Sequence, residues 1–265
     1  MSNHFVSIGF HAETEQEFLA LAEQVVADCT TLEVPNGRYL HWTSECGAEL
    51  WLQVDRWNEL AGMKPHFVGP PGMKAGLTRR IRQADCSDLD GGFHAWADPA
   101  PEQPEEGTYP FVFDAPDYDR HERLKLPCLF DVQLAAFAHS LVAFDSEHAF
   151  QAAQDPEARF PVESFIPAGL FSPDGSPTEP PVAFAVLSGR VLTTRLHENP
   201  ITGANFRSAR IRTLGGELDL VVASEIVRGD ISPGGVVTGS FWLSGRLHNH
   251  TEASTGKPVA PTSSG

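Results

Sequence analysis

The chain has 265 residues and a formal net charge of −16, with 41% hydrophobic and 20% charged residues. This composition is ordinary for a globular protein and excludes intrinsic disorder, and the length allows one large domain or two modest ones. The acidic excess lies in residues 1–180, which carry 11 basic against 29 acidic side chains, whereas residues 181–265 carry 8 against 6. An acidic body repels phosphate backbones and anionic lipid, so the charge argues against nucleic-acid and membrane partners.

No secretory or membrane-spanning segment is expected. Met1–Phe10 lacks the basic start and long apolar core of a secretory signal. The longest apolar run, Cys128–Phe144, is interrupted by Asp131, Gln133 and His139, which does not suit a bilayer. The four cysteines include no C-x-x-C pair, the spacing of many zinc and redox motifs. We therefore expect a cytoplasmic protein with reduced thiols.

The first elements of the chain predict a sheet backed by one helix. Phe5–Phe10 alternates between apolar and polar residues, which favours a strand. Thr14 and Glu17 have the spacing of a capping box, so a helix is expected to begin there. A hairpin that turns at Pro35-Asn36-Gly37 and a strand over Glu49–Asp55 follow. The predicted order is strand, helix, strand, strand, strand.

Residues 61–170 continue this body with strands and one short helix, which starts at Ser146. The further strands are expected over Pro65–Val68, Gly76–Ala84, Gly91–Trp96, Tyr109–Asp114, Cys128–Phe144 and Val162–Ile166. Residues 1–170 are therefore expected to form one acidic α+β domain. The proline-rich segment 171–181 is expected to be a linker, and residues 249–265 a flexible tail.

Residues 182–248 predict a small antiparallel β-barrel. Val182–Leu196 is too long for one flat strand, and Gly189 lies where a barrel strand would bend. Two further strands meet at the Gly215-Gly216 turn, with Arg212 expected opposite Asp219. A last strand over Val236–Leu247 completes the segment. The predicted fold class is α+β: a sheet-and-helix N-terminal body with a β-α-β-β-β start, and a C-terminal small antiparallel barrel.

The long bent first strand, the hairpin and the glycine-rich last strand of residues 182–247 resemble the oligonucleotide/oligosaccharide-binding (OB) barrel. The resemblance rests on strand pattern and covers about a quarter of the chain. It departs from the family because Ser224–Gly235 is too short for the helix that usually plugs that barrel. Another small barrel or a sandwich fits the same pattern, and no family is identified for the whole chain.

Two faces of this barrel are candidate ligand-binding surfaces. On the last strand, Trp242 is expected to share a face with Ser240 and other hydroxyl side chains, as either a ligand-stacking surface or a contact with the acidic domain. Phe206 and Arg210 share a face of the second strand, the combination that binds single-stranded nucleic acid. The expected pairing of Arg212 with Asp219 and the acidic body argue against that binding.

A metal site is a further hypothesis. The predicted strand-helix-strand-strand-strand unit resembles half of the glyoxalase/vicinal-oxygen-chelate fold, whose metal ligands come from the first and fourth strands. The resemblance implies ligands at His11, or His4 in its place, and at Glu49. Only topology supports it. No other cofactor is assigned from the sequence.

The absence of G-x-G-x-x-G, P-loop and G-x-S-x-G motifs leaves no catalytic signature in the chain. Aromatic residues on strands, such as Trp51 and Trp242, suggest contact with a protein partner or a second copy of the chain. The leading hypothesis is a non-catalytic binding or assembly protein. The alternatives are a metal-dependent enzyme of glyoxalase type and, disfavoured, a single-stranded nucleic-acid-binding OB protein.

Overall fold

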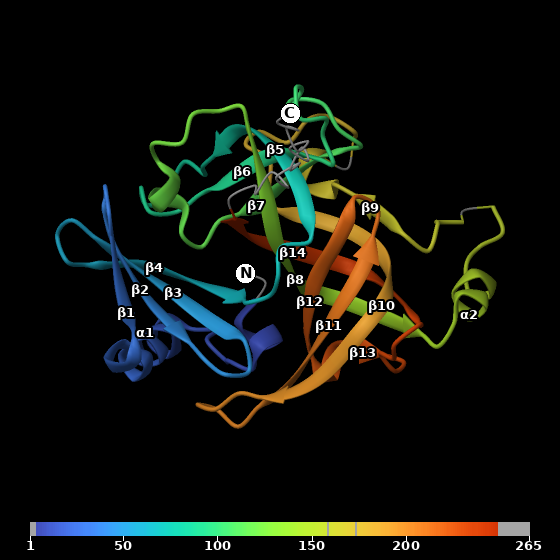
Figure 1. Ribbon diagram of the computed structural model, residues 1–265. Helices are drawn as coiled ribbons and strands as arrows, with labels where there is room; N and C mark the ends of the chain where they lie inside the picture. Colours follow the sequence, from blue (N-terminus) through green and yellow to red (C-terminus); the bar gives the residue numbers. More distant parts are fainter. Residues whose placement is uncertain (1–3, 158, 173, 249–265) are drawn as a thin grey trace, which may run out of the picture.

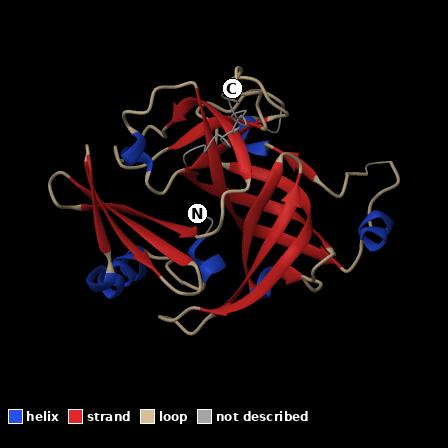
Figure 2. Cartoon of the chain, viewed as in Figure 1, coloured by secondary structure: helices blue, strands red, loops and turns tan. Residues whose placement is uncertain are grey.

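The computed structural model describes residues 4–157, 159–172 and 174–248, and this part of the chain is mostly β-structure. It contains a four-stranded sheet, a ten-stranded sheet and only two α-helices, one of them a six-residue helix (Figures 1 and 2). The predicted α+β class is therefore wrong. The expected tail, residues 249–265, lies outside the described residues.

The β-α-β-β-β start is wrong in its first element. The 3₁₀ helix η1 (His4–Ile8) takes the place of the predicted strand and contacts β4, β8, β11 and β12, so it is wedged between the two sheets. The capped helix is confirmed as α1 (Glu15–Val25), in which the Glu17 amide donates to Thr14 Oγ1 at 3.2 Å. Periodicity over six residues cannot tell a short strand from a buried helical turn, because both bury apolar side chains.

The four-stranded sheet is an antiparallel meander of adjacent strands. Its members are β1 (Thr30–Val34), β2 (Gly37–Thr43), β3 (Ala48–Asp55) and β4 (Leu60–Phe67). Leu50 and Leu52 on one face of β3 join a cluster with Leu21 and Val25 of α1. The opposite face carries polar and aromatic side chains, because Glu49 pairs with His66 and Trp51 with Lys64 across β3 and β4.

The ten-stranded sheet collects almost all remaining elements. Its strands are β5 (Met73–Ile81), β6 (Gly92–Ala97), β7 (Pro110–Asp114), β8 (Cys128–Phe144), β9 (Ser164–Ile166), β10 (Phe184–Glu198), β11 (Asn205–Thr213), β12 (Gly216–Ala223), β13 (Val227–Arg228) and β14 (Val236–His248). The short helix α2 (Glu147–Ala152) stands apart at the right of Figure 1.

Two closed rings of strands share β8 and β14. The C-terminal ring runs β10-β11-β12-β8-β14 and back to β10, and its β12–β8 pair is parallel. The N-terminal ring runs β8-β5-β6-β7-β14 and closes where Ser244 bridges Asp114. In Figure 1 the first ring lies at the right and the second above it. Both rings can form because β8 and β14 are long, and each contributes a different stretch of residues to each ring.

The expected self-contained antiparallel barrel of residues 182–248 is therefore wrong. Four of its strands come from that segment, but the fifth is β8, which belongs to the predicted N-terminal body. Five is the strand number of an OB barrel, although here one strand precedes the other four. Segment 224–235 holds only the 3₁₀ turn η5 (Ser224–Ile226) and β13. Pairing over such sequence distances leaves no local signal.

The β11–β12 hairpin turns one residue earlier than expected, so each cross-strand partner shifts by two residues. Thr213 pairs with Gly216, so the turn is Leu214-Gly215, with Gly215 at a φ of +85°. Arg212 therefore faces Glu217, and Arg210 faces Asp219. This shift moves Arg210 into a buried ion pair.

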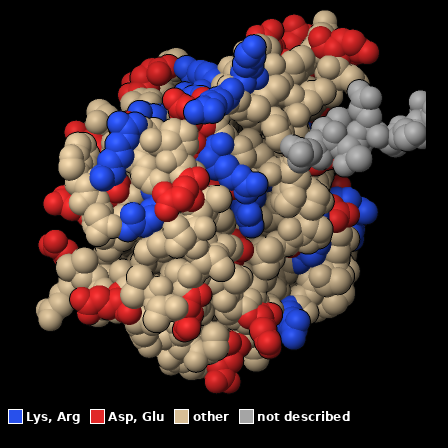
Figure 3. Space-filling view, turned by 60° about the vertical axis from the view of Figure 1, so that its left-hand side comes forward, with Lys and Arg blue, Asp and Glu red and all other residues tan. Residues whose placement is uncertain are grey.

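Charge is distributed unevenly over the surface. On the face drawn in Figure 3, basic side chains gather in the upper half and are interleaved with acidic ones, whereas the lower rim is mainly acidic. Within the described part of the chain, each helix is too short or too polar to cross a lipid bilayer.

The shared strand β8 gives a test of the ring. Residues 182–248 expressed alone should remain unfolded, because β12 and β14 would each lose a full partner strand. A fusion that places residues 128–145 after His248 through a short Gly-Ser turn should fold, because His248 already pairs with Asp131, close to the start of β8. Amide dispersion in ¹H–¹⁵N NMR spectra separates the two outcomes. A well-dispersed spectrum from the isolated segment would contradict the role assigned to β8.

Candidate functional site

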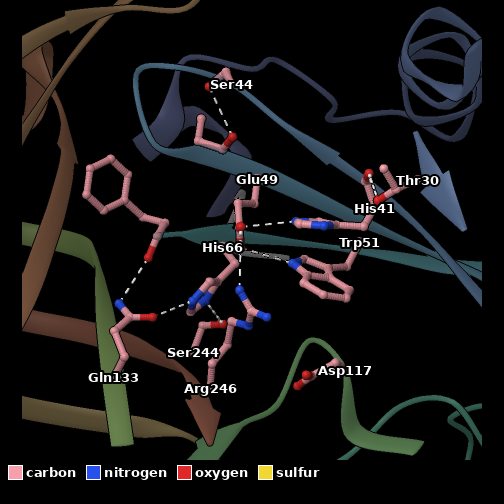
Figure 4. Close-up of polar contacts among 12 residues, drawn as sticks. Thr30, His41, Ser44, Glu49, Trp51, His66, Asp117, Gln133, Ser244 and Arg246 are labelled. Carbon is pink, nitrogen blue, oxygen red and sulfur yellow. Dashed lines mark hydrogen bonds and ion pairs between the residues drawn. The ribbon is translucent and has the colours of Figure 1, made fainter. Parts of the chain in front are cut away.

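Polar side chains fill the contact between the four-stranded sheet and the rings, here called the polar junction. It comprises His41, Glu49, Trp51, His66, Asp117, Gln133, Ser244 and Arg246 (Figure 4). They reach the junction from β2, β3, β4, β8 and β14, and from Asp117, the N-cap of the η3 turn (Tyr118–His121). The polar face of β3 and β4 thus docks on the two strands that the rings share.

Glu49 is the central anion of the polar junction and is only 2% exposed. Its Oε1 lies 3.0 Å from His41 Nε2 and 3.6 Å from Arg246 Nη1, and its Oε2 accepts from Trp51 Nε1 at 3.2 Å. The Arg246 guanidinium lies 5.0 Å from the Trp51 ring centroid. Burial raises the pKa of Glu49, but the contact with His41 and the nearby His66 and Arg246 outweigh it and leave the pKa lowered.

His66 forms an arrangement that resembles a catalytic triad. Its Nδ1 lies 2.8 Å from Ser244 Oγ and its Nε2 lies 2.7 Å from Gln133 Oε1. Burial lowers the pKa of His66 to about 4, so the ring is neutral. All three side chains are at most 1% exposed, which denies a substrate access to the Ser244 hydroxyl. We therefore interpret this group as a buried hydrogen-bond network that joins the sheets.

The network extends from Gln133 to the predicted ligand residue Arg210. Gln133 Nε2 donates to Phe67 O at 3.0 Å and to Asp219 Oδ2 at 3.2 Å. Arg210 Nη1 lies 3.0 Å from the same Asp219 oxygen, and Arg210 Nε lies 3.2 Å from Glu217 Oε2. Arg210 is thus neutralised within the fold and is not a free cation for a ligand.

A cavity of about 300 Å³ opens beside the polar junction and contains several ionisable groups. It is lined by His4, Lys64, Ile81, Gln83, Cys86, Asp90, Gly91, Asp114, His139, Val182, Ala183, Phe184 and Trp242. These residues come from η1, β4, β5 and the loop after it, β7, β8, β10 and the segment before it, and β14. We call it the Lys64 pocket.

The charged floor of the Lys64 pocket is one lysine between two aspartates. Lys64 Nζ lies 2.8 Å from Asp90 Oδ1 and 3.3 Å from Asp114 Oδ2. Trp242 Nε1 donates to the same Asp114 oxygen at 2.8 Å. Burial lowers the pKa of Lys64, but the two carboxylates outweigh it and raise the pKa overall. Lys64 is therefore a permanent cation and not a nucleophilic amine.

Two uncharged imidazoles form one wall of the pocket. The His4 ring stacks on Trp242 at 4.2 Å between centroids, and His139 meets His4 edge-on at 5.1 Å. Neither imidazole hydrogen-bonds to a described residue. Burial, followed by His139 and Lys64, lowers the pKa of His4 to about 3, and burial lowers that of His139. The wall is neutral at physiological pH.

These protonation states favour binding over covalent chemistry. Burial and Asp90 raise the pKa of the Cys86 thiol, which keeps it protonated. A histidine whose pKa is about 3 is too weak a base to abstract a proton efficiently near neutrality. Among the lining side chains, the lysine, the thiol and the His4 imidazole are thus each in an unreactive form. The pocket can hold a ligand through hydrogen bonds, charge and apolar contact.

Of the ligand-binding residues expected from the sequence, the structure places only Trp242 in this pocket. Ser240 instead pairs its hydroxyl with Ser140 at 2.8 Å. The bulge beside this pair is in β8, because Ser240 pairs with Ser140 and Phe241 with Ala138, which leaves His139 unpaired. Phe206 is fully buried and stacks on His197 at 4.9 Å. The Trp242 ring is itself covered by His4 and Phe137.

The expected metal ligands are not brought into a ligand set. His11 is exposed, and Glu49 is already engaged by His41, Trp51 and Arg246. In the described ranges no group of three or more histidine, cysteine or acidic side chains could hold a metal ion. The glyoxalase-type topology also loses its first strand to η1.

Sequence reasoning missed the floor of the pocket. Lys64 lies just before the strand expected over Pro65–Val68, and Asp90 lies just before the strand expected over Gly91–Trp96. The sequence did hold one signal. Lys64 and His66 are two residues apart, so in a strand they lie on the same face, and that face is polar although apolar residues stand on either side of them in the sequence.

The polar junction predicts a large loss of stability when Arg246 is removed. Arg246→Met should lower the free energy of unfolding by about 3 kcal/mol, because the buried carboxylate of Glu49 loses its guanidinium partner. Arg228→Met, at an exposed arginine of β13, should change it by less than about 0.5 kcal/mol. Urea denaturation of both variants measures the difference. Equal effects would show that the junction does not depend on this charge.

His66 predicts a pH dependence of stability. Its pKa falls from 6.5 to about 4 on folding, so the unfolded chain binds a proton in this range that the folded chain does not. The free energy of unfolding should therefore fall as the pH drops from about 6.5 to 4, with His66 contributing on the order of 3 kcal/mol. His66→Gln should flatten this slope, whereas His148→Gln, at an exposed position on α2, should not. Identical slopes in both variants would refute the assignment.

Comparison with known proteins adds no further constraint. No family model, no curated protein and no solved structure matches this chain.

Proposed function

We propose that this protein is a non-catalytic binding protein whose Lys64 pocket holds a small molecule. One observation carries the proposal: a buried lysine, two aspartates and an indole N–H are assembled around a cavity, and two uncharged imidazoles face it without hydrogen-bond partners among the described residues.

The energetics of the lysine support a role in binding. Lys64 is largely withdrawn from water, with a side chain 19% exposed, and desolvation costs part of what its ion pairs contribute. Well-packed apolar side chains would stabilise such a contact at least as well. The charged cluster borders a cavity, so its polar atoms are available to a ligand.

The construction of the pocket also supports binding. Its lining comes from segments between residues 4 and 242, so it exists only in the folded chain. A volume of about 300 Å³ is at the small end of the range for ligand sites, which favours a compact ligand. Apolar walls with a few directed polar groups are the usual composition of such sites.

The proposal includes a cytoplasmic location. All four cysteines lie in the described part of the chain and are free thiols, which suits a reducing compartment.

Occlusion of the pocket mouth tests the proposal. Val182 lines the pocket and is exposed, so Val182→Trp should cover the opening without disturbing the core. Val186→Trp, at an exposed position outside the lining, is the matched control. In an NMR screen with small polar fragments, wild type and Val186→Trp should show amide shifts at pocket residues that Val182→Trp lacks. The absence of pocket shifts in wild type, or their persistence in Val182→Trp, would overturn the proposal.

A further inference from the structure

We infer that the Lys64 pocket recognises a small organic cation, an ammonium group on a short apolar arm. The inference rests on the proposed function, because it names the chemical class of the ligand for that pocket. It comes from three features of the lining: its charge, its hydrogen-bonding groups and its apolar walls.

The charge of the pocket floor is not balanced. Lys64 is the cation and Asp90 and Asp114 are the anions, so the charged lining carries one negative charge in excess. Both carboxylates stay partly accessible, at 19% and 26% exposure, which leaves each of them open to a ligand. The excess negative charge attracts a ligand cation and repels an anion.

The side-chain oxygens left unused around the cavity are acceptors. Asp114 Oδ1 accepts no hydrogen bond from a described residue, whereas its Oδ2 already serves Lys64 and Trp242. Gln83 Nε2 donates to Pro181 O at 3.4 Å, and the side-chain carbonyl oxygen of Gln83 accepts no hydrogen bond from a described residue. Each neutral imidazole offers one acceptor nitrogen and one N–H donor, so the surplus of acceptors comes from the carboxylate and amide oxygens. An ammonium group is a donor with no acceptor and complements this surplus.

The walls accommodate the apolar part and the charge of such a ligand. Ile81 and Val182 supply aliphatic surface, and Phe184 lies 5.7 Å from His139 as a second aromatic surface. An ammonium group near aromatic faces gains cation–π attraction when it is partly desolvated. A neutral alcohol of the same shape would donate to fewer acceptors and would not neutralise the excess negative charge.

Three probes with one carbon skeleton test the inference: 3-methylbutylamine, 3-methylbutan-1-ol and 3-methylbutanoate. NMR titration at constant pH 7 and constant salt should show the amine binding at least about tenfold more tightly than the alcohol, with no shifts for the carboxylate. Shifts should map to the pocket and disappear in Val182→Trp.

A pair of charge variants provides the matched control. Gln83 is exposed at the pocket edge, so Gln83→Glu should tighten amine binding and Gln83→Lys should weaken it, each by about threefold or more. Gln16→Glu and Gln16→Lys, on the exposed face of α1, change net charge equally and should have little effect. Alcohol binding should not respond to either pair.

The outcomes separate the inference from the proposed function. Equal or tighter binding of the alcohol or the carboxylate, no amine shifts at about 10 mM, or equal responses to the Gln83 and Gln16 pairs would overturn the cation assignment. A fragment screen that still maps to the pocket would leave the binding function standing. Loss of all pocket shifts in the screen would remove both.

Discussion

The antiparallel pairing of β8 with β14 is the contact on which the rest of the structure depends. It runs from Val236 opposite Phe144 to His248 opposite Asp131. The other edge of each strand pairs with one strand of the C-terminal ring and one strand of the N-terminal ring. Along β8, residues 128–132 pair with β5 and residues 135–137 pair with β12. Neither ring can close without this ladder, so the two rings form one cooperative unit although their other strands lie far apart in the chain.

The same ladder also positions both polar assemblies. On β14, Trp242, Ser244 and Arg246 are spaced by two residues and share one face. Trp242 reaches the Lys64 pocket, while Ser244 and Arg246 reach the polar junction. On β4, Lys64 and His66 repeat the arrangement. The pocket is therefore continuous with the contact between the sheets, and docking of the four-stranded sheet brings Lys64 to its partners Asp90 and Asp114.

The two assemblies use similar side chains for different purposes. In the polar junction, His66 uses both ring nitrogens and Glu49 uses both oxygens on protein partners, so these two side chains join the sheets. In the pocket, Asp114 keeps an oxygen free and the imidazoles of His4 and His139 have no hydrogen-bond partner among the described residues. Polar groups that border a cavity without a protein partner are available to a ligand.

The sequence by itself determined the local elements: the Thr14 capping box that starts α1, the hairpin turning before Gly37, and the strands around Gly215. These depend on caps, turn residues and alternation within a few positions, where the backbone and nearest side chains set the energy. It also drew attention to Trp242. Only the tertiary structure decided that Phe5–Ile8 lies in a 3₁₀ helix, that β8 completes the C-terminal ring, and that Lys64 lies between Asp90 and Asp114. Those outcomes depend on strand pairing and on charges brought together across the chain, and such energies exist only between residues that the fold has already made neighbours.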